Sequence, residues 1–249
     1  MPRVEIPFVG PYATNRERPL SSQMSRNMWA EINPEARNQV AMHNMAGTRI
    51  FATLEGEDRG MHEFNNLMYA VNGDNLYSID ADGVGLILGS IGGTGRCVMA
   101  NDQSQLIITT GDTPYRYTVA GGVEAITDPD LVKPTCVAYL NSQFLFDQND
   151  GVWGEFVTSS IEAGLAIDAL DFANAESHPD DLVRIIAYRQ FAWMFGSHSV
   201  EPWQNKGSGN PPWERVSSGV QPYGVAGTHA VVTTTDHIYF LDHKRIPRR

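Results

Sequence analysis

The sequence repeats itself about every 40 to 50 residues, and a self-similarity of this period limits the possible folds more than any other feature of the chain. Residues 97–107 align with residues 136–146 at an offset of 39 without a gap, which pairs Cys97 with Cys136. Three further units are found by shifting the frame along the chain. A backward shift of 38 brings residues 106–108 onto 68–70, and a forward shift of 49 brings residues 144–146 onto 193–195. A further shift of 45 brings residues 193–195 onto 238–240. The five units share an apolar triplet, found at residues 68–70, 106–108, 144–146, 193–195 and 238–240.

Each unit has the same internal order, which predicts its local structure. A short strand is followed by a polar turn, a strongly apolar strand, a turn rich in Gly, Asp or Asn, and usually a third strand. β-Branched and aromatic residues dominate the strands, as expected for pleated, half-buried surfaces. The third strands are expected at residues 75–80, 115–119, 152–158 and 200–203.

Five units of this length match the blades of a β-propeller, in which small antiparallel sheets radiate around a channel. We therefore predict an all-β fold, a β-propeller-like array of repeated strand–turn–strand units over residues 51–249. An ordinary β-sandwich, whose hairpins also recur, is the alternative.

Residues 1–50 lack the repeat and are predicted to be an extended N-terminal arm that crosses the domain or a neighbouring subunit. Proline recurs through this segment with Arg between the prolines, which disfavours regular structure. The prolines are Pro2, Pro7, Pro11, Pro19 and Pro34.

One further segment, residues 160–171, shows a weak helical signal. Ser159 and Glu162 have the spacing of a capping box. Gly164 and Asp168 are poor helix formers, so a structured loop is expected there.

The chain carries a formal net charge of −11, and the charge is unevenly placed. Residues 134–183 contain nine acidic residues and no Lys or Arg, whereas residues 1–50 carry six Arg against four Glu. Non-specific binding to nucleic acid depends on Lys and Arg that release counterions, so a chain of this kind is not expected to grip phosphate backbones. The acidic residues of this window are Asp147, Asp150, Glu155, Glu162, Asp168, Asp171, Glu176, Asp180 and Asp181.

The cysteine content and the termini indicate the compartment. Cys97 and Cys136 are the only cysteines, too few for a disulfide scaffold or an all-cysteine metal site. There is no signal-peptide pattern and no Asn-x-Ser/Thr sequon, and no stretch approaches the roughly 20 apolar residues that span a bilayer. We expect synthesis and assembly in a reducing cytoplasm, with both thiols as small buried core residues.

Three motifs resemble sites that carry chemistry. The glycine-rich run 89–95 could cradle a phosphate, but no Gly-Lys-Ser/Thr follows it, and a turn between blades is the better interpretation. Residues 80–83, Asp-Ala-Asp-Gly, resemble part of a calcium loop without its distal Glu, so a hairpin turn is favoured. The carboxylates between Asp147 and Asp181 could supply the acid and base of a glycosidase, which requires two of them at a fixed separation.

The remaining candidates are weaker. The seven His residues have no zinc-site spacing, and Ser197-His198-Ser199 lacks the glycines of a nucleophile elbow. We therefore expect no catalytic, cofactor-binding or metal-binding residues. Core packing is expected for the tryptophans that cluster in one third of the chain, with an interface as the alternative. They are Trp153, Trp193, Trp203 and Trp213.

A series of short motifs, in order along residues 5–241, resembles a known family of virus proteins. The match is to the packaged-DNA stabilisation proteins of short-tailed bacteriophages (podoviruses), also called tail accessory factors or tail hub proteins. The motifs lie at residues 6–11, 27–31, 59–62, 67–77, 93–96, 126–130, 169–173, 177–181, 195–197, 201–207 and 213–216.

The resemblance implies a structural virion protein of the phage tail, assembled in the bacterial host cytoplasm, that is not an enzyme and holds no cofactor. Family members form a homo-oligomeric ring, hexameric by the resemblance, below the portal and adaptor proteins. The ring closes the DNA exit after packaging and carries the tailspikes and the tail needle.

Packaged DNA would pass through the lumen of such a ring without specific binding. We therefore expect part of the acidic window to face the lumen, with a solvated outer face as the alternative. The expected lumen-facing residues are Asp168, Asp171, Asp180 and Asp181.

Two features depart from the family pattern. Pro202 stands where the family has a β-former, which predicts an edge strand. Family members continue well beyond Arg249, so the propeller-like domain is expected either to be incomplete at its C-terminus or to close differently. The alternative function is a β-propeller glycan-binding module or glycosidase acting on cell-surface carbohydrate, and a third is a propeller scaffold of cellular origin.

Overall fold

The computed structural model describes residues 28–32, 40–152, 154–175, 180–209 and 211–249. The chain divides into two compact units, Met1–Ile50 and Phe51–Arg249. In the first unit, β1 (Met28–Ile32) pairs with β2 (Val40–Asn44) in an antiparallel hairpin. The segment predicted as an extended arm therefore contains a small sheet, because its apolar and aromatic residues favour strands more than its prolines oppose them.

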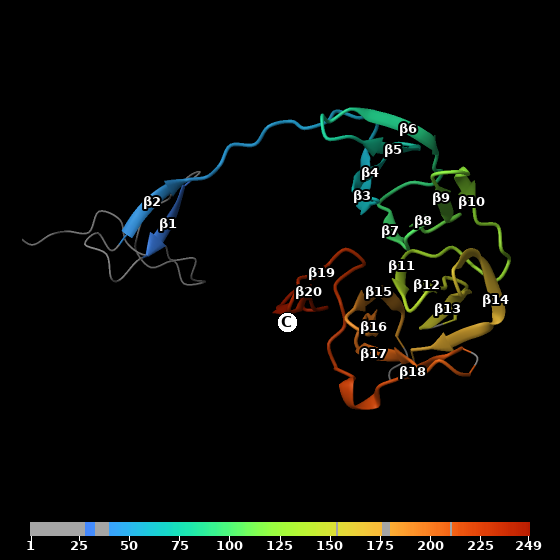
Figure 1. Ribbon diagram of the computed structural model, residues 1–249. Helices are drawn as coiled ribbons and strands as arrows, with labels where there is room; N and C mark the ends of the chain where they lie inside the picture. Colours follow the sequence, from blue (N-terminus) through green and yellow to red (C-terminus); the bar gives the residue numbers. More distant parts are fainter. Residues whose placement is uncertain (1–27, 33–39, 153, 176–179, 210) are drawn as a thin grey trace, which may run out of the picture. The chain divides into compact units, whose positions relative to one another are not determined.

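The second unit is a five-bladed β-propeller, which confirms the predicted all-β fold (Figure 1). Its first four sheets have four strands each, and the fifth has three. Helix in the described part of the chain is limited to one 3-10 turn, η1 (Ser217–Gly219), and none of it is long and apolar enough to span a membrane.

The strands follow the chain order within each sheet. The first sheet holds β3 (Asp58–Phe64), β4 (Leu67–Asn72), β5 (Asn75–Ile79) and β6 (Gly85–Ser90). The second holds β7 (Val98–Asn101), β8 (Gln105–Thr109), β9 (Tyr115–Thr118) and β10 (Gly122–Ala125). The third holds β11 (Val137–Leu140), β12 (Gln143–Asp147), β13 (Glu155–Ser160) and β14 (Ala163–Asn174). The fourth holds β15 (Leu182–Tyr188), β16 (Phe191–Gly196), β17 (Val200–Asn205) and β18 (Trp213–Arg215), and the fifth holds β19 (Val231–Thr233), β20 (Ile238–Leu241) and β21 (Pro247–Arg248).

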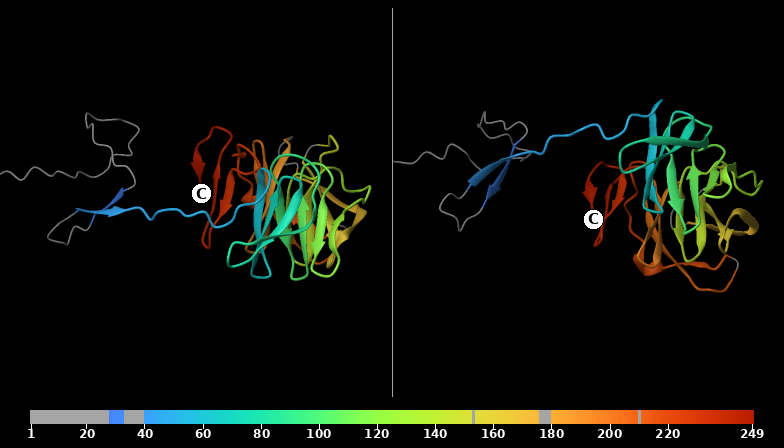
Figure 2. Two further views of the ribbon diagram at one scale, coloured as in Figure 1. Left: turned by 90° about the horizontal axis from the view of Figure 1, so that it is seen from above. Right: turned by 45° about the horizontal axis from the view of Figure 1, so that its top comes forward.

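Each sheet runs outward from the centre of the propeller. Strands β3, β7, β11 and β15 lie innermost and contact their neighbours in turn, whereas the last strand of each sheet lies at the periphery (Figure 1). Two turned views show the sheets standing face to face, with the first and the fifth at the two ends of the series (Figure 2). The predicted third strands are confirmed as β5, β9 and β17, and the one expected at 152–158 begins only at Glu155.

The first hairpin of every sheet turns at an equivalent point, and this fixes the true repeat. The last hydrogen-bonded residues before the turn are Phe64, Asp102, Leu140, Tyr188 and Thr234, which gives spacings of 38, 38, 48 and 46. Asp102 and Thr234 lie one residue beyond the ends of β7 and β19. The offsets of 39, 49 and 45 taken from the sequence are each wrong by one residue. Strands β8 and β12 are buried on both faces, so their apolar runs have no alternation that could set the register. Cys97 therefore corresponds to Thr135 and not to Cys136, although both thiols are buried as predicted.

Residues 163–174 form the longest strand, β14, and the structured loop expected there is wrong. Leu165 and Ile167, two residues apart, both pack against the core, and this period of two is that of a strand. The pairing of β14 with β13 is irregular near Ser159, which explains why the sequence shows no clean strand pattern.

The edge strand expected at Pro202 is also wrong, because β17 lies between β16 and β18. The carbonyl of Pro202 accepts a hydrogen bond from the N–H of Val216, beyond the end of β18. The N–H and C=O of one strand residue point the same way, so the missing N–H of Pro202 faces this outer side. The ladder between β16 and β17 therefore loses no hydrogen bond.

Aromatic side chains fill the spaces between neighbouring sheets. Tyr69 of the first sheet meets Tyr117 of the second with ring centroids 5.5 Å apart. Phe156 meets Trp203 between the third and fourth sheets at 5.1 Å, and Phe195 meets Phe240 between the fourth and fifth at 5.3 Å. Full burial of one such side chain contributes about 1.5–3 kcal/mol, so these contacts hold the array together.

The tryptophans are mostly core residues, as predicted. Trp203 and Trp213 are buried in the largest hydrophobic cluster, and Trp193 packs partly buried against the cluster between the fourth and fifth sheets. Trp153 lies outside the described residues.

Candidate functional surfaces

The acidic window does not form one charged surface. The side chain of Asp180 is only 4% exposed, and its carboxylate accepts hydrogen bonds from the backbone N–H groups of His198 and Ser199. Asp147 is buried too and accepts from the N–H groups of Thr135 and Cys136. Burial raises the pKa of Asp147, although these hydrogen bonds act in the opposite direction. These two carboxylates of the window therefore bind backbone N–H groups inside the sheets and do not face solvent.

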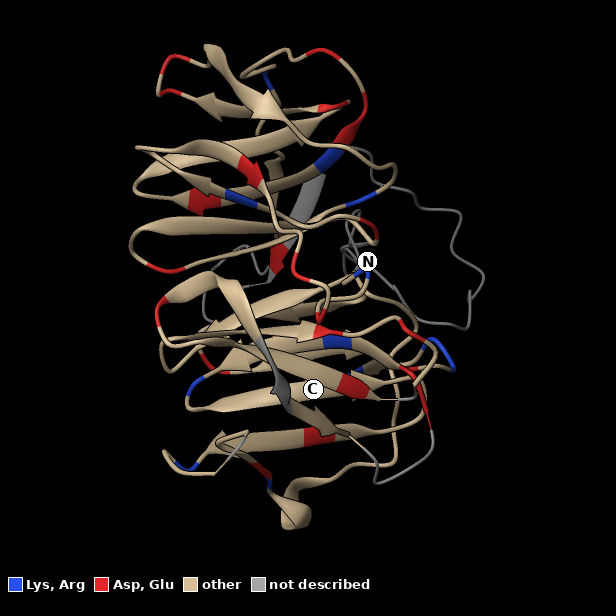
Figure 3. Cartoon of the chain, turned by 90° about the vertical axis from the view of Figure 1, so that its right-hand side faces the viewer, with Lys and Arg blue, Asp and Glu red and all other residues tan. Residues whose placement is uncertain are grey.

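The four residues expected to face a lumen lie on two segments of the chain. Asp168 and Asp171 belong to β14, the outermost strand of the third sheet, and their side chains lie outside the described part. Asp180 and Asp181 precede β15, the innermost strand of the fourth sheet. Asp181 is exposed, unlike its buried neighbour. Acidic residues are scattered over strands and turns on the side of the propeller shown in Figure 3.

A small acidic pocket of about 210 Å³ lies beside β13. Its lining includes Asp130, Asp150 and Glu155, and the pKa of Glu155 is raised by burial and then by the charge of Asp150. Two carboxylates of which one has a raised pKa are the pair that glycosidases use. Ligand pockets usually span about 300–1,000 Å³, so this one is small for a sugar chain. Among the described residues, no three His, Cys, Asp or Glu side chains are grouped as metal ligands would be.

The glycine-rich run 89–95 is held by a buried arginine. The Arg59 guanidinium, 4% exposed, donates to the carbonyls of Gly73, Ile91, Gly92 and Gly95. A phosphate loop aims its N–H groups at the ligand, whereas here the carbonyl oxygens converge on a cation. The predicted turn between blades is therefore confirmed.

The Asp-Ala-Asp-Gly motif is a turn between β5 and β6. Oδ1 of Asp80 accepts hydrogen bonds from the N–H groups of Asp82 and Val84. Gly83 has a φ of +82°, a conformation that glycine adopts readily. The carboxylate thus closes the turn, as the hairpin interpretation requires.

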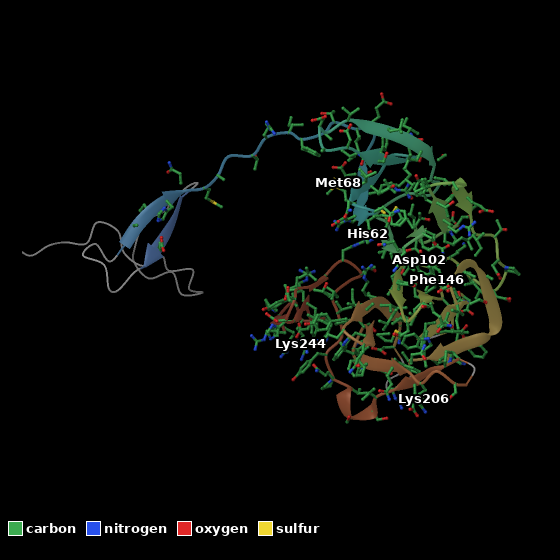
Figure 4. The ribbon with its side chains drawn as sticks, in the orientation of Figure 1. His62, Met68, Asp102, Phe146, Lys206 and Lys244 are labelled. Atoms are coloured by element: carbon green, nitrogen blue, oxygen red, sulfur yellow. The ribbon has the colours of Figure 1, made fainter. Side chains whose placement is uncertain are left out.

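The first sheet leaves one apolar face uncovered. Met61 is 71% exposed and Met68 is 40% exposed, and both line a hollow of about 500 Å³ together with Phe51. Met68 lies on the side of the sheet away from the second sheet (Figure 4). The first and last sheets in a series of blades each have one face without a neighbouring sheet. Exposed apolar patches of this kind often mark interaction surfaces.

The fifth sheet shows the same pattern at the other end of the array. Phe240 faces the fourth sheet and is buried, whereas Val232 is 59% exposed and Tyr239 is 40% exposed on the opposite face. These two residues pair across β19 and β20 and line a hollow of about 300 Å³. The sequence gives no sign of either face, because the apolar alternation is the same in central and terminal blades.

Comparison with known proteins gives a family and one curated relative. The sequence model of the family described as "Bacteriophage P22 Gp10, beta-propeller" matches residues 4–247. The tail hub protein gp10 of Salmonella phage P22 is 24% identical over an alignment of 205 residues, and the match covers 76% of this chain and 42% of that protein. The chain thus spans less than half the length of this relative.

Solved structures share the fold at low identity. Hsv2 of Kluyveromyces lactis gives a TM-score of 0.52 at 9% identity, covering 82% of this chain and 61% of that one. A chain of a nidogen–laminin complex gives 0.51 at 14% identity, covering 86% and 81%. The computationally designed Ika8 protein gives 0.50 at 11% identity, covering 87% and 65%. These likenesses extend to the fold alone.

Proposed function

The chain belongs to the phage-stabilisation family of β-propeller proteins typified by Gp10 of bacteriophage P22, and from this membership we propose that it is a structural subunit of a phage tail hub. The observation that carries the proposal is the family match over residues 4–247, which takes in nearly the whole chain. The relative named as a tail hub protein supports the same role and the same place, the virion tail.

In finer detail, we propose that copies of the chain form a ring below the portal and adaptor of a short-tailed phage. The ring closes the DNA exit after packaging and carries the tailspikes and tail needle. Two exposed apolar faces, around Met61 and around Tyr239, support a role inside a larger assembly, since a free monomer rarely exposes such surfaces without use.

Electron microscopy of the purified protein, alone and mixed with the portal and adaptor of its phage, tests this role. The expected result is a ring docked on the face of the portal assembly from which DNA leaves. A protein that stays monomeric and does not bind the portal–adaptor complex contradicts the proposal. Binding of a cell-surface glycan in the same preparation would favour the alternative function.

The path of the DNA gives a second test. We propose that the carboxylates of Asp168, Asp171 and Asp181 face the lumen and repel phosphate. Asp180 is left out, because its carboxylate is already bound in the interior. Reversal of Asp168, Asp171 and Asp181 to Lys should slow DNA ejection at low salt, and screening over about 8–10 Å at moderate salt should relieve the defect.

The matched control reverses three exposed acidic residues of the first sheet and its entry, Glu55, Glu57 and Asp82, and so makes the same change in net charge. Ejection from these particles should remain as fast as from the wild type. Equal kinetics in both sets, from particles that assemble normally, would place the acidic window on an outer face.

A further inference from the structure

The blade series ends on an apolar face at both of its ends. A series of stacked repeats normally has a polar outer face on each terminal repeat, because that face meets water. Here Met61 and Met68 are exposed on the first sheet, and Val232 and Tyr239 are exposed on the fifth. Apolar faces at both ends favour a partner that continues the series.

The free face of the first sheet corresponds to the face by which the second sheet packs against the first. At the spacing of 38 between these sheets, Met61 corresponds to Met99 and Met68 to Leu106. Leu106 is buried in the hydrophobic cluster between the two sheets, and Met99 packs against that cluster. A Cβ added to Gly60 of the first sheet would lie 3.1 Å from the terminal methyl group of Met99. The first sheet therefore presents the face that a preceding blade covers.

The free face of the fifth sheet corresponds to the opposite face of a blade. At the spacing of 46 between the fourth and fifth sheets, Val232 corresponds to Ile186 and Tyr239 to Trp193. Ile186 and Trp193 both pack against the cluster between these two sheets. The fifth sheet therefore presents the face that a following blade covers. The two free faces are the two halves of a contact that the chain already makes between neighbouring sheets.

Stacking in the same orientation also brings opposite charges together. The sheets share one strand order, so a second copy stacked in this way places its turn between β4 and β5 beside the turn between β20 and β21. The turn after β20 carries Lys244 and Arg245, both exposed. The turn after β4 carries exposed Asp74, and exposed Asp58 lies beside it, where it pairs with Asn72. Facing charges of opposite sign favour this orientation over others.

We propose that a second copy of the chain covers these faces, so that the first sheet of one copy packs on the fifth sheet of the next as a sixth blade. Each copy carries both halves of the contact, and one kind of chain therefore satisfies both faces. A head-to-tail contact of this kind joins two different surfaces, and it closes into a ring or continues as an open series of copies. The inference rests on the proposed tail-hub ring, because it names the contact by which copies of the chain join.

Sedimentation velocity of the purified chain over a range of concentrations measures this association. Met61→Asp places a carboxylate on the first face and Val232→Asp places one on the fifth, and both positions are more than half exposed, so the single chains should fold. Val119→Asp is the matched control, because Val119 is 70% exposed and lines neither hollow. An unpaired carboxylate is costly to bury, so each face variant should weaken the association at least about tenfold, and the control should match the wild type within about twofold.

An equal mixture of the two face variants identifies which surfaces meet. Met61→Asp keeps an intact fifth face and Val232→Asp keeps an intact first face, so the mixture should form dimers and nothing larger. If two first faces met, Val232→Asp would associate by itself, and if two fifth faces met, Met61→Asp would do so. Either result overturns the proposal, as does a wild-type chain or a mixture that stays monomeric.

The failure of this contact is distinguishable from the failure of the hub role. A wild-type chain that is monomeric by itself but docks on the portal and adaptor overturns the contact and leaves the hub role standing. A chain that associates head to tail but does not dock there supports the contact and contradicts the hub role.

Discussion

Arg59 offers a sharp test of how the first two sheets are joined. Its guanidinium is buried and donates to the carbonyls of Gly73, Ile91, Gly92 and Gly95 at distances of 2.8–3.2 Å. Three of these acceptors lie in the connection between β6 and β7. Arg59→Met keeps most of the side-chain volume but removes every donor, so four carbonyls lose their partner.

The expected loss follows from the burial of each acceptor. The bond to Ile91 is buried, and an unsatisfied buried acceptor costs about 1–3 kcal/mol. The other three bonds are partly buried, so water can replace the guanidinium and each loss costs nearer 0.5–1.5 kcal/mol. Since such losses are not additive, we expect Arg59→Met to lower the free energy of unfolding by about 3–5 kcal/mol, a large part of the 5–15 kcal/mol typical of proteins.

Urea unfolding followed by tryptophan fluorescence measures this loss, and hydrogen exchange of residues 91–97 locates it. Arg116→Met is the control, because Arg116 forms one ion pair with the exposed Glu124 and its loss should cost less than about 1 kcal/mol. Arg59→Lys should fall between the two, since one ammonium cannot reach four carbonyls. Equal stability of Arg59→Met and Arg116→Met would refute the reasoning.

Three further predictions follow from the same structure. A Cβ on Gly224 would collide with the backbone of Ser197, so Gly224→Ala should destabilise the fifth sheet by about 3 kcal/mol in urea unfolding, whereas Gly227→Ala, with no atom within 4 Å, should be neutral. Burial acts to raise the pKa of Asp102, but hydrogen bonds to the carboxylate outweigh it and hold that pKa below 3.8. Asp102→Asn should therefore lower the free energy of unfolding by about 1–2 kcal/mol at pH 7. In chemical denaturation at several pH values, this difference from the wild type should shrink as the pH falls below 3.8. Deletion of residues 1–44 should leave the melting temperature of the propeller nearly unchanged, since this segment belongs to a separate compact unit, but should impair incorporation into tails; normal infectious particles would contradict the second half.

The propeller could be predicted from the repeat because each blade contains the same pattern of an apolar strand followed by a turn. Its register could not be fixed, since β8 and β12 are buried on both faces and an apolar run without alternation fits two registers equally well. β14 was missed because its irregular pairing near Ser159 breaks the period on which strand prediction depends. The edge strand predicted at Pro202 was wrong for a different reason. The missing N–H of a proline breaks a sheet only if it faces a strand that would accept its hydrogen bond, and the sequence does not show which side it faces.

Candidate sites were harder to predict because they depend on contacts between segments that lie apart in the sequence. Asp180 and Asp181 are adjacent, and alternation implies that one points inward, but only the structure shows that Asp180 is the buried one.

The net charge of −11 overstates the negative charge that DNA would meet, because several aspartates are buried. Asp102, Asp147, Asp180 and Asp242 are all buried, and each accepts backbone N–H hydrogen bonds from a nearby turn or strand start. Those N–H dipoles offset much of the field that each carboxylate would otherwise project. A phosphate passing the protein would therefore respond mainly to exposed carboxylates such as Asp181. A salt-dependent change in ejection should accordingly follow substitutions at exposed positions, while a change at a buried aspartate should appear as a loss of stability.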